Sequence, residues 1–164
     1  MTSRRMLALV EAETDAAISL AVVEPDMAPN LGAILRLGAC LGAPVHVVEP
    51  CGFAFSPKMW ARSAMDYADL ATIHRHDNWA QFAGAMAGRR LVALSTRGET
   101  ALWSYRFAPG DVLMLGSESR GLPDNAMAEA GARLAIPLRR GARSLNIGMA
   151  GAIALAEAQR QVLT

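Results

Sequence analysis

The stretch VLMLGSESRGLP, residues 112–123, decides the fold, because it joins a buried strand to a glycine turn and a charged loop. Residues 112–115 are all apolar, which is typical of a strand that is covered on both faces. Gly116 then lets the backbone turn without a side chain in the way, so that a ligand can lie against the turn. Glu118 and Arg120 follow at once, and a glycine and a proline end the loop and open a helix. This order predicts a ligand site in an α/β protein.

Composition favours helices packed on a parallel sheet over a β-sandwich. Hydrophobic residues make up 52% of the 164 residues and aromatic residues only 5%, so Ala, Leu, Val, Ile and nine Met must build the core. Sixteen Lys and Arg oppose fifteen Asp and Glu, and the net charge of +1 excludes the overall basic field of a general nucleic-acid binder. A site for a polyanion must therefore be local, or shared between subunits.

Several kinds of site are not expected. Cys40 and Cys51 have neither a CxxC spacing nor a matching pair of His, so we expect no metal and a reduced, cytoplasmic protein. No apolar run approaches the length of a membrane span. The phosphate-binding signatures G-x-x-x-x-G-K-[ST] and, after the first strand, G-x-G-x-x-G are missing. His74 and His76 flank Arg75 in a segment that we interpret as a solvated polar loop.

Strands and helices alternate along the chain, which predicts a parallel α/β sheet. We expect residues 1–16 to form a loosely held arm and residues 17–164 to form a single domain. Asn30 is expected to cap the first helix and Gly42 to close it, and Asp77 to cap a later one. The expected strands are 18–23, 45–48, 91–95, 112–115 and 134–136, and the expected helices are 30–41, 57–65, 77–86, 123–130 and 145–162.

Polar residues gather where these strands end or helices begin. Asn30 and Gly32 open a helix whose free N–H groups attract anions, and Arg36 follows on the same helix. A second group, at the end of a strand, consists of Leu94, Ser95 and Thr96. A third group follows residues 136–138 and consists of Arg139, Arg140, Arg143, Ser144, Leu145 and Asn146, a basic patch at a helix start. Each group alone also fits a plainer interpretation: a capped helix with an exposed arginine, a polar turn, or Ser144 as a helix cap beside solvated arginines.

Taken together, these groups resemble the SpoU branch of the SPOUT RNA methyltransferases, over residues 20–161. The first group resembles the family's N-x-G-x-x-x-R motif. The second motif, G-x-E-x-x-G-L, is matched by Gly116, Glu118, Gly121 and Leu122, and the third, I-P followed by S-L-N, by Ile136, Pro137, Ser144, Leu145 and Asn146. The third motif is followed here by Gly148 and Met149, where many members have a serine. The resemblance implies a Rossmann-like parallel sheet with a C-terminal deep trefoil knot, and a homodimer that builds its RNA site across the subunit interface.

The resemblance also implies the activity and the roles of residues. The reaction is a metal-free transfer of a methyl group from S-adenosylmethionine to a ribose 2′-hydroxyl of RNA. The implied cofactor contacts are Leu94, Ser95, Thr96, Gly116, Ile136, Leu138, Ser144 and Leu145. The implied catalytic residues are Arg36, Asn30, Glu118 and Asn146, and the expected RNA contacts are Arg120, Arg139 and Arg143.

Within the family, the chain most resembles compact tRNA enzymes that act on the wobble nucleotide. The features that carry this resemblance are the short chain, the run 49–53 and the pair Asp66-Tyr67. An rRNA 2′-O-methyltransferase and a non-catalytic dimer that binds RNA or the cofactor are the alternatives.

Overall fold

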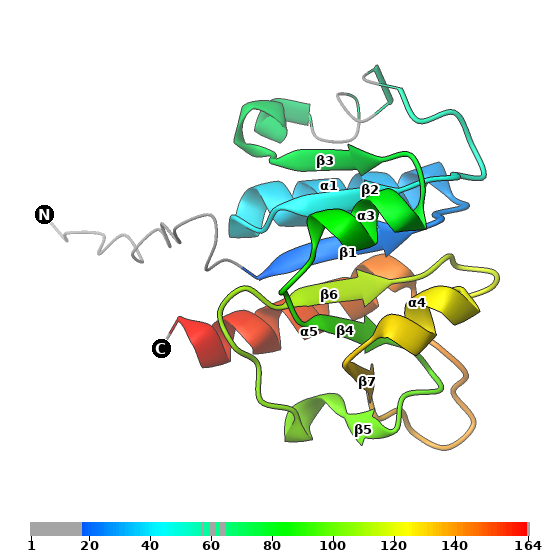
Figure 1. The fold of residues 1–164 in the computed structure, drawn as a ribbon, viewed down its shortest axis with the longest axis vertical. Coiled ribbons are helices and arrows are strands. Elements are labelled where there is room, and N and C mark those ends of the chain that lie inside the picture. Colours follow the sequence, from blue (N-terminus) through cyan, green and yellow to red (C-terminus); the bar gives the residue numbers. More distant parts are fainter. Residues whose placement is uncertain (1–17, 57, 60–61, 63–64, 164) are drawn as a thin grey trace, which may run out of the picture.

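The computed structural model describes residues 18–56, 58–59, 62 and 65–163 (Figure 1). The expected arm, residues 1–16, and part of the expected helix 57–65 lie outside these residues. Seven strands form one sheet in the order β3-β2-β1-β6-β4-β7-β5, and every pairing between neighbours is parallel. The strands are β1 Ser19–Val23, β2 Val45–Val48, β3 Ile73–His76, β4 Leu91–Leu94, β5 Thr100–Ala101, β6 Val112–Leu115 and β7 Ala132–Ala135. The predicted parallel α/β class is confirmed.

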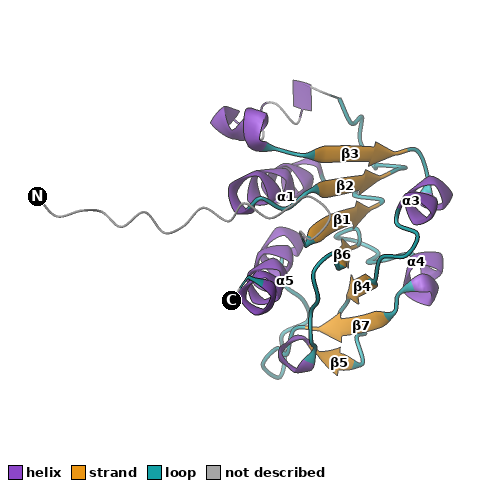
Figure 2. Ribbon diagram, turned by 60° about the vertical axis from the view of Figure 1, so that its left-hand side comes forward, coloured by secondary structure: helices purple, strands orange, loops and turns teal. Residues whose placement is uncertain are grey.

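Helices cover both faces of the sheet. The longer helices α1 (Ala28–Leu41) and α5 (Ile147–Val162) lie on one face, and the short helices α3 (Trp79–Ala85) and α4 (Asp124–Glu129) lie on the other (Figure 2). Two 3-10 turns, η1 (Met65–Leu70) and η2 (Leu102–Ser104), complete the described elements. No helix in the described part of the chain is long and apolar enough to cross a membrane.

The two faces of the sheet form two cores, because successive side chains of a strand point to opposite sides. On β1, Leu20 and Val22 belong to the core under α1 and α5, whereas Ala21 and Val23 belong to the core under α3 and α4. The strand β6 lies between β1 and β4, and all its residues are buried. The stretch 112–115 is therefore a central strand, as its continuous apolar run predicts.

Helix α1 starts earlier than predicted. Its N-cap is Met27, and Asn30 lies inside the first turn, so the prediction that Asn30 caps the helix is wrong. Pro29 explains the earlier start, because proline lacks an N–H group and fits the first turn of a helix. At the other end, Gly42 has a φ of 65° and its N–H group donates to the carbonyl of Gly38, which confirms it as the closing residue.

Two further caps differ from the prediction. The side chain of Asn78, and not that of Asp77, accepts a hydrogen bond from the backbone of Gln81 at the start of α3. Helix α5 begins after Asn146, two residues beyond the expected start at Leu145, and Asn146 accepts from two backbone N–H groups of its first turn.

The segment around His74 and His76 is a strand, so the expected polar loop is wrong. It is the edge strand β3, which the sequence conceals because Ile73 is its only apolar residue. His74 is exposed as expected, but His76 is buried and its Nε2 lies 2.9 Å from Nδ1 of His46. Burial and the neighbouring imidazoles lower the pKa of His46 from its ordinary 6.5 to about 3. Among the described residues, no cluster of His, Cys, Asp or Glu could hold a metal ion.

Candidate functional site

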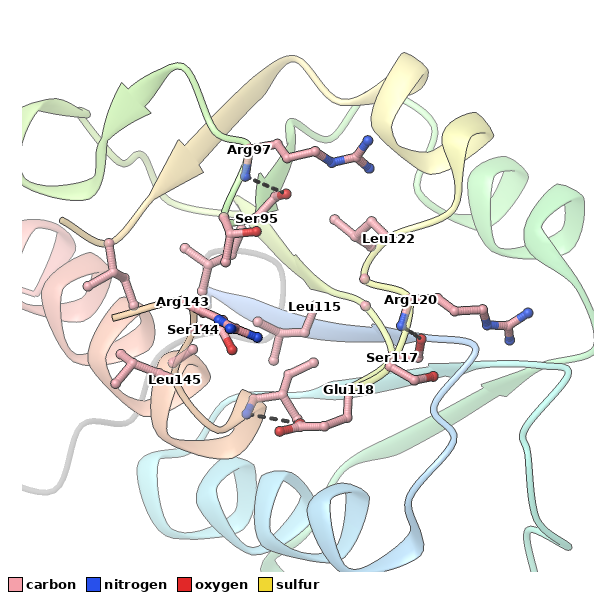
Figure 3. Close-up of a pocket in the computed structure, with 18 of the residues that line it drawn as sticks. Ser95, Arg97, Leu115, Ser117, Glu118, Arg120, Leu122, Arg143, Ser144 and Leu145 are labelled. Carbon is pink, nitrogen blue, oxygen red and sulfur yellow. Dashed lines mark hydrogen bonds between the residues drawn. The ribbon is translucent and has the colours of Figure 1, made fainter. Parts of the chain in front are cut away.

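A cavity of about 920 Å³ opens at the carboxyl ends of β4, β6 and β7 (Figure 3). Its volume falls within the roughly 300–1,000 Å³ of small-molecule sites. The walls come from segments 94–97, 115–124, 136–138 and 142–150, which join strands to the elements that follow them. This is the edge at which open α/β sheets bind ligands.

All the predicted cofactor contacts line this cavity. Apolar side chains and hydroxyl groups face it together, so it offers both a surface for a flat ring and hydrogen-bonding partners for polar groups. These residues are Leu94, Ser95, Thr96, Gly116, Ile136, Leu138, Ser144 and Leu145.

Gly116 lies against the backbone of its own loop. A Cβ atom at this position would lie 2.1 Å from the carbonyl carbon of Gly121 and 2.2 Å from the nitrogen of Leu122. The returning part of its own loop therefore occupies the side of Gly116 where a side chain would lie, and Gly116 also lines the cavity. Ser117 and Gly121 close this loop with two backbone hydrogen bonds of 2.9 and 3.2 Å. The loop is thus a tight, self-packed wall of the cavity.

Three of the four predicted catalytic residues meet in one hydrogen-bonded network. Nδ2 of Asn30 donates to Oε2 of Glu118 at 3.0 Å, and Nδ2 of Asn146 donates to Oδ1 of Asn30 at 3.1 Å. The same Glu118 oxygen accepts from the backbone N–H of Ile147 at 3.2 Å. Because these residues belong to the three motifs, the network ties α1, the loop after β6 and the start of α5 together.

Arg36, the fourth residue, lies apart from this network. It does not line the cavity, and its guanidinium lies 5.1 Å from the centre of the Tyr67 ring, in cation–π contact with η1. Six residues along a helix correspond to a rotation of about 240°, so Arg36 and Asn30 leave α1 in different directions. Within one chain, the structure does not bring Arg36 to the other predicted catalytic residues.

Seven arginines show a contrast between those at the cavity and those away from it. Four arginines at a distance from the cavity form ion pairs of 2.6 to 3.6 Å, and the pairs are Arg75–Glu49, Arg90–Asp111, Arg133–Glu99 and Arg160–Glu157. Arg97, Arg120 and Arg143 line the cavity, and no described carboxylate lies within 4.0 Å of them (Figure 3). Arg139 is exposed on the loop before Arg143 but does not line the cavity. The rim therefore carries positive charge that an anionic ligand can neutralise.

Two residues at this site, Arg97 and Asp26, were not predicted from the sequence. Arg97 lines the cavity and directly follows the predicted residues Ser95 and Thr96. Its place at the end of a strand could have identified it as a cavity residue. Asp26 lies in the loop after β1, and its side chain accepts hydrogen bonds from the backbone N–H groups of Glu118 and Ser119. Its partners are about 90 residues away in sequence, so no local signal pointed to it.

The sequence pattern of the SpoU rRNA methylase family matches residues 17–156.

The chain belongs to the SpoU methylase family.

Two similar SpoU relatives are enzymes named tRNA (cytidine(34)-2'-O)-methyltransferase. The one from Ancylobacter novellus is 46% identical over 146 residues, which cover 88% of this chain and 92% of the relative. The one from Escherichia coli K12 is 35% identical over 147 residues, covering 88% and 94%. Both alignments span most of each protein.

Solved structures agree with this assignment to the SpoU methylases. A structure described as giving insight into 2′-OH methylation of C/U34 on tRNA has a TM-score of 0.83 and 38% identity, and covers 90% of this chain and 97% of that one. The AdoMet-bound rRNA methyltransferase of Sinorhizobium meliloti has a TM-score of 0.80 and 30% identity, covering 92% of this chain and 58% of that one.

Proposed function

We propose that this chain is an S-adenosylmethionine-dependent tRNA methyltransferase that modifies the ribose 2′-oxygen of cytidine 34, the wobble nucleotide, in the cytoplasm. The observation that carries the proposal is the cavity lined by residues of the second and third motifs, which the Asn30–Glu118–Asn146 network ties to the first motif. Relatives with this named activity, aligned over 88% of the chain, support it.

The residues of the cavity fit S-adenosylmethionine. Leu94, Ile136 and Leu138 offer an apolar wall for the adenine ring, and Ser95 and Ser144 offer hydroxyl groups for the polar parts. The volume of about 920 Å³ accepts a nucleoside-sized ligand and leaves room for part of a second substrate. When bound, the cofactor supplies a sulfonium methyl group, which is an electrophile at carbon.

The residues of the chain act mainly by positioning. A hydroxyl held in line and near contact with its electrophile gains a large effective molarity, of about 10⁵ M or more. The hydroxyl must also lose its proton. A guanidinium remains protonated in proteins, so Arg36 acts as a donor that orients the ribose hydroxyl and its phosphate and stabilises the developing alkoxide. The RNA phosphate is the proposed proton acceptor.

The position of Arg36 supports a homodimer. Since Arg36 lies on the exposed side of α1 and outside its own cavity, we propose a homodimer in which it acts at the partner's cavity. Helices α1 and α5 lie side by side and leave apolar side chains exposed: Met27 and Met149 are 47% and 61% exposed beside the Asn30–Asn146 contact. An exposed apolar patch rimmed by polar residues is typical of a subunit interface.

The C-terminal threading is proposed to form a deep trefoil knot, a rare exception to the usual rules of chain topology. Two contacts support it. After β7 the chain passes the loop that follows β6, where Glu118 accepts from Ile147, and α5 then returns beneath β6. A Cβ atom at Gly151 of α5 would lie 2.9 Å from a methyl carbon of Leu115, so the helix packs closely on the central strand.

RNA is proposed to bind along the rim. Arg120 and Arg143 line the cavity without a carboxylate partner among the described residues, and Arg139 extends the same basic surface. Arginine binds phosphate in a bidentate manner, so this rim suits the backbone of the anticodon loop.

A methylation assay tests the proposal. The purified protein is incubated with labelled S-adenosylmethionine and total tRNA, and the modified nucleoside is identified by mass spectrometry. We expect 2′-O-methylcytidine at position 34, and no incorporation into a matched tRNA with deoxycytidine at that position. Incorporation into rRNA alone when a parallel reaction contains rRNA, incorporation into a base, or binding of cofactor without any incorporation would each refute the proposal.

A further inference from the structure

The loop between β6 and α4 depends on a carboxylate from a different part of the chain. We infer that Asp26 is a positioning residue that holds the loop 116–121 in the shape that binds the cofactor. This inference rests on the proposed function, because it assigns Asp26 a part in the same cavity. Asp26 itself does not line the cavity, so its effect must pass through the loop.

The contacts of Asp26 span the middle of the loop. Its Oδ1 accepts from the backbone N–H of Glu118 at 3.0 Å, and its Oδ2 accepts from the backbone N–H of Ser119 at 3.3 Å. The hydroxyl of Ser119 also donates to Oδ2. One carboxylate therefore satisfies three donors on two successive residues, which fixes the direction of the peptide between them.

A second loop supports Asp26 from behind. A Cβ atom at Gly52 would lie 3.0 Å from the Cα and 3.1 Å from the Cβ of Asp26, and the N–H of Gly52 donates to the carbonyl of Pro25 at 2.8 Å. Gly52 belongs to the run 49–53, which resembles the compact tRNA enzymes and has no place in the mechanism above. Its close approach gives that run a structural purpose, because it restricts how far Asp26 can move.

Through the loop 116–121, the position of Asp26 affects the hydrogen-bonded network of Asn30, Glu118 and Asn146. Glu118 donates to Asp26 only through its backbone N–H, so its carboxylate remains available to accept from Asn30 and from the N–H of Ile147. Most of the loop lines the cavity, including Gly116, whose backbone has no free space. A shift of the peptide at Glu118 and Ser119 would therefore alter both the cavity wall and the catalytic network.

The chemistry requires a carboxylate at this position. An asparagine can accept with one oxygen only, so its amide group would face the N–H of Ser119 as a second donor. The Ser119 hydroxyl, together with the backbone donors, lowers the pKa of Asp26 below its ordinary value, against the opposing effect of burial. The group is thus ionised at neutral pH and accepts at both oxygens.

The test compares Asp26→Asn with Asp77→Asn in the full-length protein. Asp77 is exposed and its variant changes the net charge equally, but Asp77 has no contact with the loop in the described structure. We measure the Kd for S-adenosylmethionine by calorimetry, kcat and both KM values with tRNA, and the thermal midpoint. For Asp26→Asn we expect the cofactor Kd and its KM to rise about 10- to 100-fold, the KM for tRNA to change less than about threefold, and Asp77→Asn to behave like the wild type.

Two further variants keep the test decisive if Asp26→Asn folds poorly. Ser119→Ala removes only the hydroxyl donor and should raise the cofactor Kd less than Asp26→Asn does. The double variant should equal Asp26→Asn alone, because the hydroxyl then has no carboxylate to bind. An additive double variant, or an Asp26→Asn cofactor Kd equal to that of Asp77→Asn, would overturn the inference while the proposed function stands. A wild-type protein that neither binds the cofactor nor methylates tRNA would overturn both.

Discussion

Replacing Asn146 by alanine should lower both stability and activity. The Asn146 side chain caps α5, because its Oδ1 accepts from the N–H groups of Gly148 at 2.9 Å and Met149 at 3.2 Å. Its Nδ2 also donates to Asn30. Loss of an N-cap costs about 1 kcal/mol, and loss of the exposed side-chain hydrogen bond costs about 0.5 to 1 kcal/mol. The free energy of unfolding should fall by about 1.5 to 2 kcal/mol, and the thermal midpoint by about 3 to 8 °C.

Asn146→Asp separates the cap from the network. Aspartate is also a good N-cap, and its negative charge interacts favourably with the start of a helix. It cannot donate to Oδ1 of Asn30, however, and it places a second carboxylate close to Glu118. We therefore expect a thermal midpoint within about 2 °C of the wild type, and methylation of tRNA reduced at least about tenfold.

Asn78→Ala is the matched control for the cap. Asn78 caps α3 by accepting from the N–H of Gln81 at 2.9 Å, and it does not line the cavity. This variant should lower the free energy of unfolding by about 1 kcal/mol through the loss of its cap, yet keep the wild-type rate of methylation. Circular dichroism melts and methyl-transfer rates check both expectations. An unchanged melting point for Asn146→Ala would refute the capping argument, and wild-type methylation by Asn146→Asp would refute the need for the network.

Three further predictions concern other parts of the molecule. Since the pKa of His46 is about 3 when folded and near 6.5 when unfolded, the unfolded chain binds more protons between these values. Urea unfolding between pH 7 and pH 5 should show the free energy of unfolding falling below pH 6.5 by up to about 1.4 kcal/mol per pH unit. The pH dependence should be weaker for His46→Phe, and an equal pH dependence would contradict the lowered pKa of His46. Gly116→Ala should abolish cofactor binding in calorimetry, because its Cβ meets backbone, whereas Gly131→Ala, whose nearest contact is 3.7 Å away, should bind normally. Arg120→Ala should lower the slope of log affinity for tRNA against log salt by about one, measured by filter binding, and an unchanged slope would exclude a phosphate contact.

Local sequence predicts most of the sheet, because buried parallel strands are continuous apolar runs. The predicted strands 18–23, 45–48 and 112–115 match β1, β2 and β6 within one residue. The edge strands β3 and β5 were missed, since an edge strand is half-exposed and keeps polar residues, and β5 has only two residues. The place of Leu94, Ser95 and Thr96 at the cavity was predictable because a strand end is a local feature, and parallel strands bring such ends to one edge.

By itself, the sequence determined the parallel α/β class and the three motifs, and its resemblance to the SpoU family pointed to residues that line the cavity. Only the tertiary structure decided how those motifs interact. Asn30 was expected to cap its helix, but it binds Glu118, 88 residues away, and Asn146, 116 residues away. Arg36 was expected beside them, but the turn of the helix directs it elsewhere. Helix starts and side-chain partners depend on contacts between distant segments, which no local pattern records. At Gly116, the local sequence indicated that the turn needs a glycine. It did not indicate that the backbone of Gly121 and Leu122 lies against it.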